Sequence, residues 1–138
     1  MYFGAILVVS SAAFVSANCF TNGDNWGGDR SAALAAAQTL CNDGTLNGDY
    51  TKAEVKYKCV NLSTIKKVDF TITADYLIFA DAHITLGSED CVRDLHTQIN
   101  ACEHGGVSPW YEFDEPTGDK NLIGNLQFTA DPNTGNCA

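Results

Sequence analysis

Basic residues are scarce in this chain of 138 residues, which has 8 Lys and Arg against 17 Asp and Glu. A surface with this balance repels a phosphate backbone unless the few bases are clustered. Five lysines do gather in one stretch, but their spacing is typical of the solvated faces of strands: Lys52, Lys56, Lys58, Lys66 and Lys67. We therefore expect no nucleic acid among the partners of this protein.

Long apolar runs are missing after the first residues of the chain. The run from Gly4 to Val15 is shorter than the ~20 residues that a helix needs to cross a bilayer. It closes on Val15-Ser16-Ala17, which places small residues at the positions that a signal peptidase reads. We predict that residues 1–17 are a cleaved signal peptide and that residues 18–138 form one secreted, extracellular domain without membrane attachment.

Motifs of metal and catalytic sites are also missing. No two cysteines stand two to four residues apart, as the paired ligands of a zinc site do. Neither the D-x-[DN]-x-[DN]-G loop of a calcium site nor the G-x-S-x-G motif of a nucleophilic serine occurs. We expect no metal, no cofactor and no catalytic residue, and hence a protein that is not an enzyme.

What the chain does have is an even number of cysteines, all after the predicted signal peptide. Six cysteines in a small secreted domain predict three disulfides. A helix predicted around Cys91 and Cys102 separates them by about 16 Å along its axis, beyond disulfide reach. These two cysteines must therefore bond to different partners, and the pairing is otherwise open among Cys19, Cys41, Cys59, Cys91, Cys102 and Cys137.

The periodicity of apolar residues predicts two helices. An alanine-rich run from Ser31 to Cys41 follows Asp29 as a helix cap, and Asn42-Asp43-Gly44 ends it. The second helix begins with Ser88 as its cap, has acidic residues in its first turn and ends before Gly105. Cysteines on both helices predict that disulfides tie them to the rest of the domain.

Alternating residues predict strands around and between these helices. The period of half-buried strands occurs at 55–59, 68–73 and 126–130, and an aromatic strand is expected at 110–113. The run 76–86 is either a further strand or a short buried helix. Together these elements predict an α+β fold in which two main helices cover a mostly antiparallel sheet of four or five strands.

Aromatic residues beside polar ones are the candidate ligand-binding residues. A carbohydrate offers apolar C–H faces and a rim of hydroxyls, so it binds a flat exposed ring with amides or carboxylates alongside. Trp26 lies in Asn25-Trp26-Gly27, and Trp110 and Tyr111 precede Glu112 and Asp114. We predict a glycan site that uses Trp26, Trp110, Tyr111 and Asp114.

Two alternative functions remain open. The same stapled domain would serve as a durable effector or toxin that binds a host or competitor protein. A small secreted ribonuclease would need an imidazole paired with a carboxylate, for which His104 with Glu103 or Glu112 is the candidate. His104 is also placed to complement the end of the second helix, which favours a structural role.

A modification site is predicted at Asn61. Asn61-Leu62-Ser63 is an N-glycosylation sequon between two predicted strands. In an exposed loop of a secreted protein it would accept a glycan.

Two long segments resemble those of one family of small fungal secreted proteins. They are Ile99-Asn100-Ala101-Cys102-Glu103-His104-Gly105-Gly106 and Phe128-Thr129-Ala130-Asp131-Pro132-Asn133-Thr134-Gly135-Asn136-Cys137. Members of the family begin with a Cys and a Trp-Gly pair before an alanine-bearing helix that ends in Cys. The matching residues here are Cys19, Trp26-Gly27 and Cys41, followed by Cys59-Val60-Asn61 and Val68-Asp69-Phe70.

The chain thus resembles the family of the mushroom glycan-binding protein Y-three over nearly the whole predicted domain. The resemblance implies an α/β/α-type sandwich, a homodimer formed through sheet edges, and lectin-like recognition of glycans that contain N-acetylhexosamine. The stretch 107–124 is longer than in the family, so it would add to or cover a sugar site. Fold transfers across such a resemblance more safely than function.

Overall fold

The computed structural model describes residues 17–75, 82–114 and 122–138. The predicted signal peptide, except for Ala17, lies outside the described residues, and so does most of the ambiguous run 76–86. The remainder of that run contains the strand β5, Ile84–Leu86. None of the described helices is long and apolar enough to cross a membrane.

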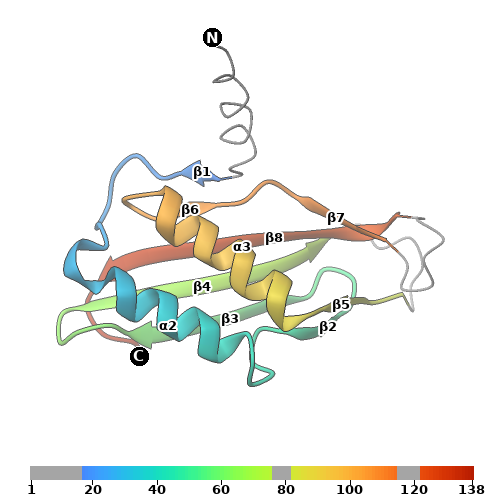
Figure 1. Ribbon diagram of the computed structural model, residues 1–138, viewed down its shortest axis with the longest axis horizontal. Coiled ribbons are helices and arrows are strands. Elements are labelled where there is room, and N and C mark those ends of the chain that lie inside the picture. The colour runs from blue at the N-terminus through green and yellow to red at the C-terminus, as the bar shows by residue number, and fades with distance from the viewer. Residues whose placement is uncertain (1–16, 76–81, 115–121) are drawn as a thin grey trace, which may run out of the picture.

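A six-stranded antiparallel sheet is the main element of the fold (Figure 1). Its long strands are β3 (Val55–Asn61), β4 (Lys66–Asp75) and β8 (Leu122–Thr134). The strand order is β1-β6-β8-β4-β3, and β7 also pairs with β8. Three short strands complete this sheet: β1 (Asn18–Cys19), β6 (Gly106–Val107) and β7 (Tyr111–Asp114).

Two helices and a second, small sheet complete the domain. The helices are α2 (Arg30–Leu40), preceded by the 3-10 turn η1 (Gly27–Asp29), and α3 (Ser88–Ala101). The small sheet pairs β2 (Gly48–Tyr50) with β5; the sequence analysis allowed a strand at β5 but predicted neither β2 nor this second sheet. The α+β class with two main helices and a mostly antiparallel sheet is confirmed.

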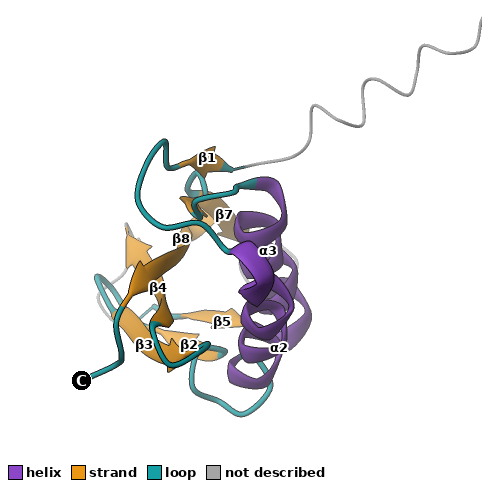
Figure 2. Cartoon of the chain, turned by 90° about the vertical axis from the view of Figure 1, so that its left-hand side faces the viewer, coloured by secondary structure: helices purple, strands orange, loops and turns teal. Residues whose placement is uncertain are grey.

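Both helices lie against the same face of the sheet (Figure 2). The described helices therefore form one layer on the sheet, whereas the family resemblance implied an α/β/α-type sandwich. The reason is visible in β4, where the even-numbered residues Val68, Phe70, Ile72 and Ala74 are buried and their odd-numbered neighbours are only half-buried. One face of the sheet is apolar and covered, and the other is polar and carries no helix in the described part of the chain.

The core fills the space between the helices and the covered face of the sheet. Its largest fully buried side chains are Trp26, Tyr50, Phe70 and Phe128. The Nε1 of Trp26 donates a hydrogen bond of 2.8 Å to the carbonyl of Cys102, which fixes the N-terminal segment against the end of α3. Burial raises the pKa of Tyr50, whose hydroxyl donates to the carbonyl of Leu46.

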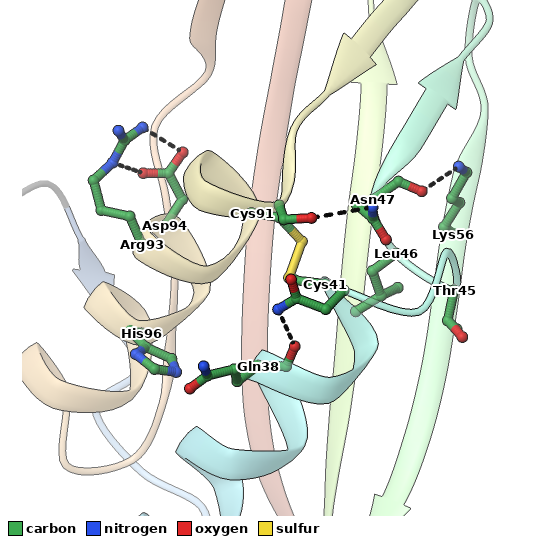
Figure 3. The surroundings of a disulfide bond; sticks show 12 residues. Gln38, Cys41, Thr45, Leu46, Asn47, Lys56, Cys91, Arg93, Asp94 and His96 are labelled. Atoms are coloured by element: carbon green, nitrogen blue, oxygen red, sulfur yellow. Dashed lines mark hydrogen bonds and ion pairs between the residues drawn. A yellow bond between two sulfur atoms is a disulfide. The ribbon is translucent and has the colours of Figure 1, made fainter.

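Three disulfides link the elements of the domain, as the cysteine count predicted. Cys19 bonds to Cys102, Cys41 to Cys91 and Cys59 to Cys137. The bond between Cys41 and Cys91 joins the end of α2 to the first turn of α3 and lies beside Leu46 (Figure 3). Cys91 and Cys102 have different partners, so the second helix is held at both ends.

The ends of several elements differ from the predictions. The N-cap of α3 is Gly87, with Ser88 as the first helical residue, and Asp29 at the N-cap of α2 makes no side-chain cap bond. The strand β8 continues through Pro132, where a turn was expected, and pairs there with Val68. Beyond Ala130, β8 has a neighbouring strand on one side only, so a residue without an N–H is tolerated there.

Candidate functional site: the open face of the sheet

The face of the sheet that the helices leave uncovered carries the candidate site. We call it the open face; it consists of the odd-numbered residues of β3 from Val55 to Asn61, of β4 from Lys67 to Asp75 and of β8 from Asn125 to Asn133. Side chains alternate between the faces of a strand, so each of these residues shares its face with its direct cross-strand partner. The pairing places Tyr57 opposite Thr71 and Asp69 opposite Asp131.

The apolar positions of β3 point to this open face. The predicted period of two is confirmed, yet Val55 and Tyr57 are 54% and 55% exposed. The alternate residue Lys56 lies on the helix side instead, with its Nζ 4.2 Å from the centre of the Tyr50 ring. At this position of β3 the core is thus covered by the aliphatic part of the Lys56 side chain and its cation–π contact, and not by an apolar residue.

Tyr57 is held in place by a polar cluster on the neighbouring strands. Its hydroxyl donates a hydrogen bond to Oδ1 of Asp69, which raises the pKa of the Tyr57 hydroxyl. The other carboxylate oxygen of Asp69 accepts from Nδ2 of Asn133 at 2.7 Å and lies 3.6 Å from Nζ of Lys67. An exposed aromatic ring is therefore fixed beside a carboxylate, an amide and an ammonium.

Asp131 is a second carboxylate on the open face, opposite Asp69. Its pKa is raised, first by burial and then by the nearby carboxylates of Asp69 and Asp24, against the hydrogen bond from Asn133 and the charge of Lys67. Within the described part of the chain, Asp131 makes no salt bridge. The ionised form of Asp131 therefore lacks a cation of its own.

A second exposed aromatic residue lies at the opposite edge of the sheet. Trp110 is 41% exposed and belongs to the short break between β6 and β7, both of which pair with β8. Ser108 bridges the break by bonding to the backbone of Phe128, and Nε2 of Gln127 donates to the Ser108 carbonyl at 3.2 Å. Three strand spacings, about 14 Å, separate this edge from β3.

The predicted site residues do not come together. Trp26 is fully buried, so the prediction that its ring is an exposed platform is wrong. Tyr111 pairs with Leu126 on the covered side and contacts the ring of Phe128, with centroids 6.0 Å apart. The side chain of Asp114 lies outside the described residues, which leaves Trp110 as the one exposed aromatic of the predicted set.

Sequence reasoning missed Tyr57, Asp69 and Asn133. The pairing register of β3 and β4 would have grouped them, because it places the odd-numbered residues of both strands on one shared face. The pattern within each strand could not say which face the helices would cover.

The histidine proposed for a ribonuclease has a structural role. Nδ1 of His104 bonds to the carbonyls of Gly23 and Asp24 at 3.0 and 3.2 Å, which holds the N-terminal loop. Glu112 is far away, because β6 after His104 pairs at Ala130 of β8 whereas Glu112 pairs at Asn125, about 17 Å further along that strand. The pairing of His104 with Glu112 is therefore wrong.

Asn61 is exposed at the last position of β3, and not in the predicted loop. Its Oδ1 accepts a hydrogen bond of 2.8 Å from the backbone N–H of Cys137. N-glycosylation joins the sugar to Nδ2, so this bond leaves the acceptor atom available. The sequon thus adjoins the end of the open face, beside the disulfide between Cys59 and Cys137.

A hollow on the outer side of α3 is a weaker candidate for a ligand site. Its two basic side chains are already engaged: Arg93 pairs with Asp90 and Asp94, and Nε2 of His96 bonds to the carbonyl of Leu34 at 2.9 Å. In the described ranges of the chain, no group of three or more His, Cys, Asp or Glu side chains could hold a metal ion.

Comparison with known proteins adds no further constraint. No protein-family model and no curated protein matches this chain. The open face is therefore the feature from which we infer function.

Proposed function

We propose that this protein is a secreted, non-enzymatic lectin-like protein that binds glycans containing N-acetylhexosamine on the open face of its sheet. One observation carries the proposal: the half-exposed ring of Tyr57 is fixed by Asp69 in a field of amide, hydroxyl and carboxylate side chains. A pyranose needs this combination, a flat ring for its C–H face and polar groups for its hydroxyls. The three disulfides support secretion, because such bonds persist in oxidising compartments.

The rigidity of the open face supports the same function. A sheet braced by helices on one side, with its C-terminal tail tied to β3 by a disulfide, presents side chains that lose little freedom when a ligand binds. The resemblance to the Y-three family implies the same ligand class. The proposed site lies on the open face, whereas the sequence predicted a site at Trp26, Trp110, Tyr111 and Asp114.

A glycan array with the mature, oxidised protein tests the proposal. Tyr57→Ala should weaken binding of the best glycan by about two- to tenfold, the usual contribution of one aromatic contact. Ile65→Ala is the matched control, because Ile65 is 68% exposed but lies in the hairpin outside the open face. Absence of binding at high protein concentration would refute the proposal, and capture of a host protein that competing sugars do not disturb would favour the effector alternative.

A further inference from the structure

The open face carries an excess of negative charge. Its ionisable side chains are Asp69, Asp75 and Asp131 against Lys67 alone. Lys67 already lies 3.6 Å from Asp69, so one of these charges is compensated. The chain as a whole has a formal net charge of -9. A ligand that carries carboxylates or sulfates would be repelled from this face, and a cationic ligand would be attracted.

Asp131 is the group to which a cation would bind. Asp131 in β8 lies directly opposite Asp69 in β4, and Asn133 follows two residues later in β8. Asp131 also lies near Asp24, whose carboxylate accepts a hydrogen bond from Thr134. Asn133 and Lys67 are the groups that oppose the negative potential there, and both also bind Asp69. Burial raises the pKa of Asp131 most, and the nearby carboxylates of Asp69 and Asp24 raise it further.

The arrangement of aromatic and acidic groups suits one kind of sugar. Tyr57 lies diagonally from Asp69 on one side of β4, and Asp131 lies directly opposite Asp69 on the other side. Two strand spacings and an offset of two residues therefore separate Tyr57 from Asp131, about 12 Å between Cα atoms. A chain of linked sugars can lie across such a distance, with one ring on Tyr57 and a later unit at Asp131. A neutral hexosamine can pack on the ring of Tyr57, but only a sugar with a free, protonated amino group brings a cation to Asp131.

We propose that the open face binds hexosamine oligosaccharides in which some amino groups are free and protonated, as in partially deacetylated chitin. A pyranose ring packs on Tyr57, and the ammonium of a later unit of the same chain pairs with the carboxylate of Asp131. The inference rests on the proposed glycan-binding function and names its ligand class. It predicts that acidic glycans are excluded from the site.

Calorimetric titration with two oligosaccharides of matched length tests the inference. One is fully N-acetylated and the other is partly deacetylated, and both are titrated at weakly acidic pH, where the amines are protonated. We expect the deacetylated sugar to bind about five- to tenfold tighter, and this preference to shrink as salt screens the charges.

Two charge-matched variants locate the effect. Asp131→Asn should remove the preference while leaving the acetylated sugar bound. Glu89→Gln removes the same charge from the first turn of α3, on the helix side, and should leave the preference intact. Near-UV circular dichroism of each variant confirms that the fold is retained.

The remaining outcomes separate the two proposals. Equal binding of both sugars would overturn the charge inference and leave the glycan-binding function standing. Equally tight binding of oligolysine of the same charge would show unspecific attraction of polycations, and would overturn the inference as well. Binding of neither sugar would count against both proposals.

Discussion

Removal of the three disulfides, one pair at a time, separates two physical causes of stability. In each double variant both cysteines become alanine, which leaves the other bonds intact. The bonds close loops of different length, with sequence separations of 50 for Cys41–Cys91, 78 for Cys59–Cys137 and 83 for Cys19–Cys102. They also differ in burial, and the two causes predict opposite rankings.

Loop length alone predicts that Cys41–Cys91 matters least. The chain-entropy relation gives a loss of about 4.1 kcal/mol in the free energy of unfolding for this bond, and about 4.5 kcal/mol for each of the other two. The structure adds a packing cost, because Cys41 and Cys91 are both fully buried, whereas Cys59 and Cys137 are partly exposed. Deleting two buried sulfur atoms without filling their space costs a further ~1–3 kcal/mol.

We therefore expect C41A/C91A to be the least stable of the three and C59A/C137A to be the most stable. Urea unfolding followed by far-UV circular dichroism gives the three free energies. The free energy of unfolding of a domain of this kind is about 5–15 kcal/mol in total. A C41A/C91A variant that is already unfolded in buffer would therefore also agree with the predicted ranking. A smaller loss for C41A/C91A than for C59A/C137A would refute the packing argument.

Three further predictions follow from single contacts. Trp26→Phe should lower the free energy of unfolding by about 1–3 kcal/mol in urea titrations, because the buried carbonyl of Cys102 loses its donor. Asp131→Asn should raise the melting temperature at neutral pH and not at strongly acidic pH. The folded-state pKa of Asp131 is raised, so the wild-type residue favours folding below its unfolded pKa and this stability is lost as pH rises through the folded pKa; equal melting shifts at both pH values would contradict this. Ser63→Ala should lower the mass of the secreted protein by one N-glycan, while an unchanged mass would show that Asn61 is not modified.

Periodicity and cysteine arithmetic were sufficient to predict the class of the fold. The 3.6-residue period around Leu95 and Ile99 and the alternation in β4 each reflect burial on one side of one element. The exclusion of a bond between Cys91 and Cys102 followed from helix geometry alone. These are local properties, so the sequence could reveal them.

The number of layers could not be predicted in the same way. Whether helices cover one face of a sheet or both depends on where the connections return, and no local pattern encodes this. The small sheet of β2 and β5 depends on a contact between segments more than thirty residues apart, Tyr50 with Ile84. Pro132 also misled the prediction, because a proline ends a strand only where its N–H would have had a partner.

The burial of Trp26 could not be predicted for a related reason. Tryptophan attracts attention as a ligand platform, but the largest ring in a small domain is also its best core residue, and Trp26 has that role with its N–H satisfied. In β3 the neighbouring residue Lys56 packs toward the helices, so the side chain of Tyr57 points to the other face and its ring is exposed to solvent. An aromatic residue exposed on an edge strand favours aggregation unless polar groups surround it. Asp69, which accepts the hydrogen bond of the Tyr57 hydroxyl, and Asn133 supply such polar groups, and the ligand that we propose would use the ring together with them.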